Sequence, residues 1–218
     1  MNWSFTLAPQ TCWPDPAAMV EQLRTFGVQR LFVSVHPWAQ EGSRHYETLK
    51  SNNLCLQSQN GTFYPWNGWS LNTCPQYNKS SPTCLYDPSN SAARETLWSA
   101  LKSGYFDHNI TNFWTDGTEP AGTSPLPSDA AFANGLLPSP AAFMMWPVWH
   151  AQTVADGAVA AGSNDTWMLA RSAWANSHRH NTIVWSGDIA SDWSTLQSQV
   201  IAGLNAMLTI PYWNSDTG

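Results

Sequence analysis

Short apolar runs alternate along the chain with segments in which apolar residues recur at helical spacing. Residues 30–37 (RLFVSVHP) are apolar enough to form a strand that is covered on both faces. The same pattern predicts further strands at residues 111–116, 166–171, 182–185 and 207–213. Helices are predicted at residues 15–27, 90–105, about 151–162 and about 191–205. In the first helix, Asp15 is the expected cap, Pro16 suits the first turn, and Gly27 ends it.

Five strands with helices between them predict parallel βαβ units and an α/β fold. Two long segments, residues 55–88 and 117–145, are rich in Pro, Gly, Asn and Ser. They are expected to be loops on the C-terminal face of a barrel. A complete (β/α)8 TIM barrel takes eight units in about 250 residues. The sequence therefore predicts a partial TIM barrel.

Composition and charge exclude several classes of function. The chain is 43% hydrophobic but only 11% charged, and its net charge of −6 gives no basic stripe for nucleic acid. No stretch approaches the roughly 20 apolar residues of a membrane span. The chain contains neither a Gly-x-Gly-x-x-Gly turn nor a phosphate loop, and its His and Cys spacings fit no metal site. No cofactor, metal or membrane partner is therefore expected.

Cysteines and glycosylation motifs favour the secretory pathway or an extracellular location. The first residues, MNWSFTL, lack the features of a signal peptide. Five Asn-x-Ser/Thr motifs nevertheless begin at Asn2, Asn60, Asn78, Asn109 and Asn164. The four cysteines, which fit no zinc spacing, are Cys12, Cys55, Cys74 and Cys84. Because Cys74 and Cys84 flank a short loop, they are expected to form a disulfide; the alternative is four buried thiols.

Tryptophan is unusually abundant, with 14 residues, many of them beside Pro, Gly or Asn. Packing explains most aromatic residues in most proteins. Trp66, Trp69, Trp146 and Trp149 are expected in loops, where their rings also suit stacking against the apolar faces of sugars.

Three aspartates stand where predicted strands end: Asp116 in FWTDGTEP, Asp188 in VWSGDIASDW and Asp216 in PYWNSDTG. The C-terminal ends of parallel strands meet at one mouth, which is where barrel enzymes place their catalytic groups. A single carboxylate at such a place commonly caps the next helix or pairs with a loop. Three together, each with a tryptophan two or three residues upstream, favour a catalytic mouth.

Two carboxylates across a barrel mouth suit glycoside cleavage. Retaining enzymes use one as nucleophile and the other as acid/base, with the carboxyl groups about 5–5.5 Å apart. Asp116 and Asp188 come from strands with one predicted strand between them, so they can face each other. Arg171 and Arg179 are candidate cations that would stabilise the ionised acid. These residues alone do not assign which acid has which role.

Longer motifs resemble glycoside hydrolase family 31. FWTDGTEP resembles that family's nucleophile motif, W-x-D-x-x-E-P, and the segment from ARSAWANSHRH to the final SDTG is similar to the stretch that carries its acid/base. WPDPAAMVEQLRTFGVQRLFVSVHP resembles a helix and strand of the same family. The resemblance covers nearly the whole chain in register. It implies about the third to seventh strands of the family's barrel.

The resemblance also implies separate roles for the acids and their neighbours. Asp116 corresponds to the nucleophile and Asp188 to the acid/base. The implied substrate-binding residues are Arg179 for sugar hydroxyls, Asp216 at the floor of the subsite, and Trp114 and Trp185 as its walls.

Four further residues are expected to have supporting roles. Glu119 is expected to order the loop behind Asp116 rather than to touch substrate. Arg171 is expected either to brace the strand of Asp116 or to form a structural ion pair. His36 and His150 are expected to be structural.

The implied function is retaining hydrolysis of terminal α-linked sugars from oligosaccharides or polysaccharides through a glycosyl-aspartate intermediate. The motifs lie closer to the α-xylosidase-like side of the family than to its α-glucosidase-like side. The alternatives are α-glucan lyase chemistry and a non-catalytic carbohydrate-binding protein or inactive fragment.

Residues 1–218 are expected to be one partial barrel, truncated at both ends. The family's remaining barrel strands and its β-sandwich domain are expected to lie outside the chain. The isolated chain is therefore expected to be poorly stable and weakly active, because it would leave strand edges and apolar surface open. Robust turnover of an aryl α-glycoside by these 218 residues alone would contradict this expectation.

Overall fold

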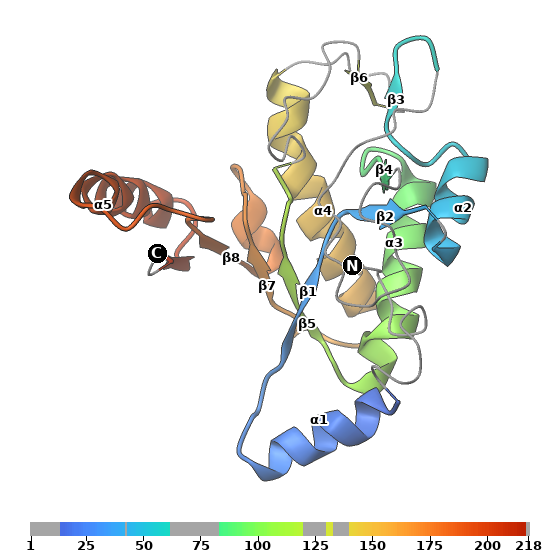
Figure 1. Ribbon diagram of the computed structural model, residues 1–218, viewed down its shortest axis with the longest axis horizontal. Helices are drawn as coiled ribbons and strands as arrows, with labels where there is room; N and C mark the ends of the chain where they lie inside the picture. Colours follow the sequence, from blue (N-terminus) through green and yellow to red (C-terminus); the bar gives the residue numbers. More distant parts are fainter. Residues whose placement is uncertain (1–13, 42, 62–82, 120–129, 133–139, 217–218) are drawn as a thin grey trace.

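The protein is built on a parallel sheet with strand order β1-β5-β7-β8-β9 (Figure 1). The computed structural model describes residues 14–41, 43–61, 83–119, 130–132 and 140–216. Within them, the strands of the sheet are β1 (Phe32–Val35), β5 (Asn112–Thr115), β7 (Met168–Ala170), β8 (Thr182–Trp185) and β9 (Trp213–Asn214). All neighbouring pairs are parallel. The predicted α/β fold with five parallel strands is confirmed.

Five α-helices accompany the strands in the described residues. They are α1 (Pro16–Thr25), α2 (Arg44–Ser51), α3 (Ser91–Gly104), α4 (Pro140–Ala160) and α5 (Trp193–Met207), with short 3-10 helices η2 (Phe106–His108) and η3 (Ser177–His180). In Figure 1, α3 and α4 lie together beside β1 and β5, whereas α5 lies at the β8–β9 end of the sheet. No helix in the described part of the chain combines the length and apolar character needed to span a membrane.

Local signals set the helix boundaries that the sequence predicts best. The Asp15 carboxylate accepts a hydrogen bond of 2.9 Å from the Ala18 N–H, Pro16 is the first residue of α1, and Gly27 follows with φ of +85°. This arrangement satisfies backbone donors that the helix itself leaves unpaired. The first and second predicted helices are confirmed.

Helix α4 begins at Pro140, well before the predicted start near residue 151. The segment PAAFMMWPVWH is apolar almost throughout, so it lacks the alternation that marks a helix face, and Pro147 suggests a break. The helix nevertheless continues through Pro147. Trp146 and Trp149 were therefore wrongly predicted in a loop: Trp146 is fully buried and Trp149 packs against the core. Trp66 and Trp69 lie outside the described residues.

The last predicted strand was also too long. Helix α5 continues to Met207, and β9 contains only Trp213 and Asn214. Met207 therefore belongs to helix α5 and not to a strand. Many apolar side chains of α5, and that of Leu208 directly after it, are exposed to solvent. They are Trp193, Leu196, Val200, Ile201, Leu204, Met207 and Leu208.

The two predicted loops contain regular structure. Strand β2 (Trp38–Gln40) pairs antiparallel with β4 (Thr83–Leu85), and β3 (Gln57–Ser58) pairs with β6 (Ala130–Ala131). We call β2, α2, β3 and β4, residues 38–41, 43–61 and 83–85, the β2–β4 lobe. It follows β1 directly and precedes α3. These strands are too short to leave a periodic signal in the sequence.

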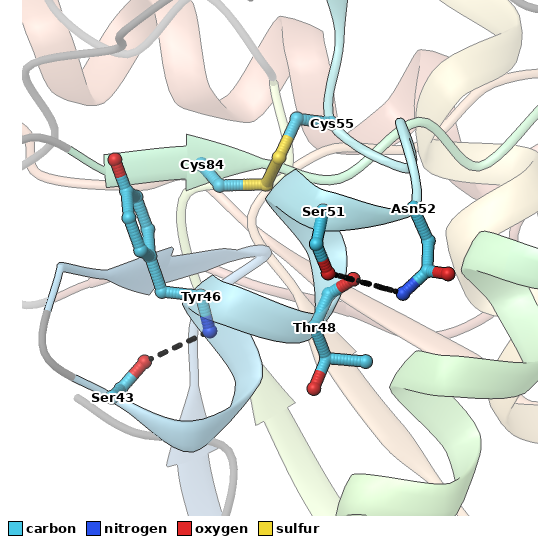
Figure 2. The surroundings of a disulfide bond; sticks show 7 residues. All are labelled: Ser43, Tyr46, Thr48, Ser51, Asn52, Cys55 and Cys84. Carbon is cyan, nitrogen blue, oxygen red and sulfur yellow. Dashed lines mark hydrogen bonds between the residues drawn. A yellow bond between two sulfur atoms is a disulfide. The ribbon is translucent and has the colours of Figure 1, made fainter.

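A disulfide joins Cys55 to Cys84 within this lobe (Figure 2). The chain beside β4 brings the two cysteines together, because the Leu56 N–H donates to the Leu85 carbonyl and Cys55 forms a bridge with Tyr86. The predicted Cys74–Cys84 disulfide is therefore wrong, as is the alternative of a free thiol at Cys84. Closeness in sequence favoured Cys74, which lies outside the described residues, whereas the fold brings Cys84 to a partner 29 positions away.

The two faces of the main sheet differ. Phe113 and Met168 are fully buried in the core on one face. On the other face, parallel register sets Trp114 beside Leu169, and Leu169 beside Ile183. Trp114 is 39% exposed there. The open face is therefore the one available to the residues that follow the strands.

Candidate active site

Parallel register brings the residues after β1, β5 and β7 together. Val35 is level with Thr115, and the Asp116 N–H donates to the Val35 carbonyl at 3.1 Å. The Arg171 N–H likewise donates to Thr115. Because side chains alternate along a strand, Asp116 shares the open face with Trp114. The sequence FWTD thus places the Asp116 carboxylate at the C-terminal end of the sheet, above an exposed tryptophan.

The Asp116 carboxylate is held on both oxygens. Its Oδ1 accepts hydrogen bonds from the Gly117 N–H at 2.7 Å and from Arg171 Nη1 at 3.2 Å. Its Oδ2 lies 3.3 Å from Nε2 of His36. The side chain is 20% exposed. An acid with three donors from three sites has little freedom to rotate.

These contacts keep Asp116 ionised. Burial alone would raise the pKa of this carboxyl, but the hydrogen bond and charge of His36 lower it, as do Arg171 and the Gly117 N–H. The net result is a pKa below the ordinary aspartate value. A carboxylate that stays charged is suited to act as a nucleophile.

Arg171 connects the two predicted catalytic acids. Its Nη1 lies 3.2 Å from Asp116 Oδ1 and 3.4 Å from Asp188 Oδ2. Its Nε lies 3.2 Å from Glu119 Oε1. The expected ion pair of Arg171 is therefore present, and one of its partners is Asp116 itself. The contact with Glu119 fits the expected role of Glu119 behind the nucleophile.

The shared guanidinium also limits the distance between the acids. Both carboxylate oxygens touch the same nitrogen, so their separation cannot exceed the two contact distances taken together. That limit applies to these two oxygens, and it is compatible with the separation of about 5–5.5 Å between the carboxyl groups of retaining enzymes. The geometry is compatible with direct attack by one of the acids.

Gly117 is required where the chain turns after Asp116. Its φ is +67°, in the left-handed region that favours glycine. A Cβ atom there would lie 2.5 Å from the Trp38 ring. Trp38 comes from β2, so the β2–β4 lobe packs directly against the loop that carries Asp116.

The remaining predicted residues surround this centre to different degrees. Asp188 is 86% exposed, and Trp114 meets Trp185 edge to face with ring centroids 5.8 Å apart. The Asp216 N–H donates to Ser186 Oγ at 3.0 Å, which ties the end of β9 to the loop before Asp188. Arg179 lies exposed in η3, and its guanidinium makes no ion pair with an acid of the described residues.

A groove of about 560 Å³ lies next to Asp188. It is formed by the loop after the acid, the first turns of α5 and the end of β9. Its lining residues include Ile189, Trp193, Gln199 and Asp216.

Comparison with known proteins decides the family. The model of the glycosyl hydrolases family 31 TIM-barrel domain matches residues 1–218, the full length of the chain. The chain belongs to glycoside hydrolase family 31. The predicted family is thus confirmed, and the sheet is confirmed as part of a TIM barrel.

Several relatives of this family are similar to the chain. An uncharacterized family 31 glucosidase of Pseudescherichia vulneris is 33% identical over 207 residues, covering 94% of the chain and 36% of the relative. An α-xylosidase of Saccharolobus solfataricus is 28% identical over 225 residues, covering 100% and 27%. The crystal structure of a family 31 α-xylosidase from a soil metagenome, complexed with xylose, has a TM-score of 0.84 and 29% identity, covering 99% and 29%. The chain spans 27% to 36% of the length of these curated relatives.

Sequence reasoning missed one contact of this family 31 site. His36 was expected to be structural, yet it touches Asp116 directly. The signal was present in the strand pairing: once Ser34 is level with Trp114, His36 must lie beside Asp116 two residues later. His150, by contrast, is buried in α4, where burial lowers its pKa to about 3 and the Tyr86 hydroxyl lies 2.7 Å from Nδ1.

In the part of the chain that the structure describes, no three His, Cys, Asp or Glu side chains are grouped as metal ligands. The reactive groups on the open face are carboxylates with a guanidinium between them.

Proposed function

We propose that this chain carries the catalytic site of a retaining α-glycosidase, with Asp116 as nucleophile and Asp188 as acid/base. The observation that carries the proposal is the Arg171 side chain, which touches both carboxylates at the C-terminal ends of β5 and β8. The matching family and the glycosidases among the relatives support it. The activity, the substrate and the partners of the whole protein all form part of this proposal.

In the first step, an oxygen of Asp116 bonds to the anomeric carbon as the glycosidic bond breaks. The Asp188 carboxyl gives its proton to the departing oxygen. In the second step, Asp188 takes a proton from water while that water's oxygen attacks the same carbon. Each step inverts the configuration at the anomeric carbon, so the released sugar retains its original configuration and the Asp116 carboxylate is restored. Arg171 neutralises the charge of Asp116 between turnovers, and the charge of Asp188 while the glycosyl group is bonded to Asp116.

The surroundings of the acids suit a terminal sugar of an oligosaccharide or polysaccharide. Trp114 and Trp185 would form walls of the subsite, and Asp216 would accept hydrogen bonds from sugar hydroxyls. Arg179 would contribute from its exposed position in η3. The motifs favour an α-xylosidase-like substrate over an α-glucosidase-like one, and α-xylosidases occur among the relatives.

A fluorinated substrate tests the proposal directly. A 5-fluoro-α-xylosyl fluoride should leave one fluoroxylosyl group on the peptide that contains Asp116, detected by mass spectrometry. Asp116→Asn should abolish the adduct. Asp107→Asn, at an exposed acid paired with Lys102, is the matched control and should leave the adduct unchanged. An adduct on another residue would overturn the assignment.

Adduct formation, together with analysis of the released sugar, separates hydrolysis from the two alternative functions. A folded protein that binds the sugar but forms no adduct would be a carbohydrate-binding protein. An α-glucan lyase would form the adduct yet release an unsaturated sugar. Turnover in ¹⁸O-labelled water therefore discriminates, because hydrolysis incorporates the label at the anomeric carbon and elimination does not.

We also propose that the protein matures in the secretory pathway. The Cys55–Cys84 disulfide supports this, because such bonds are rare in reducing compartments. Three motif asparagines, Asn60, Asn109 and Asn164, are exposed. Secretion from a eukaryotic host followed by N-glycosidase treatment should lower the apparent mass. An unchanged mass together with free thiols at Cys55 and Cys84 would contradict the proposal.

A further inference from the structure

His36 stands beside the nucleophile, buried from solvent. Only 4% of the residue is exposed, and its Nε2 lies 3.3 Å from Asp116 Oδ2. An ionised carboxylate can only accept hydrogen bonds, so Nε2 must carry a hydrogen for this contact to be favourable. The other oxygen, Oδ1, is held by Arg171 and the Gly117 N–H.

The imidazole is itself held in place. Trp38 packs on it with ring centroids 4.4 Å apart, and Trp38 is 4% exposed. The same indole lies against the Gly117 backbone, where a Cβ would clash with it. Trp38 belongs to β2, whose partner β4 carries Cys84 of the disulfide. The β2–β4 lobe thus packs on His36 through Trp38.

We propose that His36 is a positioning residue that fixes the orientation of the Asp116 carboxylate for attack. This inference rests on the proposed function of Asp116. Rotation of a carboxylate about its Cβ–Cγ bond would exchange its two oxygens. With His36 on Oδ2 and two other donors on Oδ1, that rotation breaks contacts on both oxygens. The oxygen that faces the sugar therefore stays the same from one turnover to the next.

Other charged groups near Asp116 also affect its pKa and would remain after a substitution at His36. Arg171 faces Asp116 from the end of β7, and Arg171 also forms ion pairs with Glu119 and Asp188. These groups remain when His36 is replaced. The hydrogen bond and charge of His36 lower the pKa of Asp116, so its loss should raise that pKa. Attack needs the ionised form, so the acidic limb of kcat/KM should then move to higher pH.

Three substitutions separate positioning from simple packing. Glutamine places an amide N–H where Nε2 lies, asparagine places one nearer Nδ1, and phenylalanine fills the space without a donor. His36→Asn and His36→Phe should lower kcat by about 10- to 100-fold with KM changed by less than about 3-fold, as expected for a misplaced reacting group. His36→Gln should stay within about 5-fold of the unchanged protein. Equal losses for all three, or a full-activity His36→Phe, would overturn the proposal.

A second measurement does not require turnover. In protein labelled with ¹³C at aspartate carboxyls, the Asp116 signal is assigned by its absence in Asp116→Asn. Its titration should shift to higher pH in His36→Phe, and less in His36→Gln. If the unchanged protein neither turns over nor forms the fluoroglycosyl adduct but the titration shifts, the catalytic proposal fails while the contact between His36 and Asp116 stands. An unshifted titration in a folded His36→Phe would remove the basis for positioning.

Discussion

The two predicted catalytic acids stand at strand ends one strand apart, but their surroundings differ. Asp116 is 20% exposed and is held by His36, Gly117 and Arg171. Asp188 is 86% exposed and touches Arg171 alone among the charged groups of the described residues. On the Asp116 side, the β2–β4 lobe covers the loop. On the Asp188 side, the next helix, α5, displays exposed apolar residues.

This difference follows the separate needs of the two proposed roles. A nucleophile must stay ionised and point at one carbon, which buried donors achieve. An acid/base must exchange protons with the leaving group and then with water, which an exposed position allows. Two aspartates at equivalent strand ends thus differ in burial and in hydrogen-bond partners because their neighbours differ. Changes at the two acids should accordingly differ in kind as well as in size.

The largest effect is expected at the held acid. Asp116→Asn keeps the shape and can still accept from Gly117 and Arg171, but an amide is a poor nucleophile. We expect kcat/KM to fall by about 10⁴-fold or more, as when a nucleophile is removed from a site that acts as a unit. Steady-state kinetics with an aryl α-xyloside measures this, and circular dichroism checks that the fold is retained. Residual activity within about 10-fold would contradict the nucleophile assignment.

The exposed acid should give an effect that depends on the leaving group. Asp188→Asn should lower kcat/KM by about 10²- to 10⁴-fold for a disaccharide, whose departing oxygen needs a proton. A substrate with fluoride or dinitrophenolate as leaving group should be much less affected. The comparison of the two substrates provides the control within one variant. An equal loss for both would mean that Asp188 has another role.

Much of this site could be predicted from the sequence because its signals are local. FWTD and VWSGD put an acid directly after an apolar run, and the run fixes which end of the sheet the acid occupies. The separation of Asp116 and Asp188 by one strand then follows from strand order, and the structure has β7 between β5 and β8. The cap of α1 was predictable for the same reason.

What could not be predicted depends on contacts between distant segments. Cys55 and Cys84 meet because the chain beside β4 pairs with it, and no spacing rule reveals that pairing. The sequence shows only that His36 follows a strand; its contact with Asp116 can be inferred only once the register of β1 with β5 is known. The early start of α4 was hidden because the sequence PAAFMMWPVW is apolar on every side of the helix and has no polar face to set its period.

The disulfide tests whether the lobe stabilises the Asp116 side. Cys55→Ser should lower the free energy of unfolding by about 3–4 kcal/mol, the chain-entropy value for a closed loop of this length, since the cysteines are 29 positions apart. Cys84→Ser should cost about the same. The double variant should be no less stable than either single one, because each change removes the same bond. Additive losses in denaturant unfolding would show that the thiols act separately.

The smallest effects are expected from the helix caps on the Asp116 side and on the Asp188 side of the sheet. Ser43, buried in the lobe, accepts a hydrogen bond of 3.2 Å from the Tyr46 N–H at the start of α2 (Figure 2). Ser43→Ala should lower the free energy of unfolding by about 1 kcal/mol, the usual cost of a lost cap. Asp192 caps α5 in the same way by accepting from the Thr195 N–H, but it is exposed.

Asp192→Ala should therefore cost less than Ser43→Ala, because water can replace the lost acceptor at an exposed helix end but not at a buried one. Urea unfolding of both variants measures the difference, and Asp192→Asn, which keeps the acceptor, should match the unchanged protein. A larger loss at Asp192 would reverse the comparison. It would mean that the start of α5, next to Asp188, is the more tightly packed of the two sides.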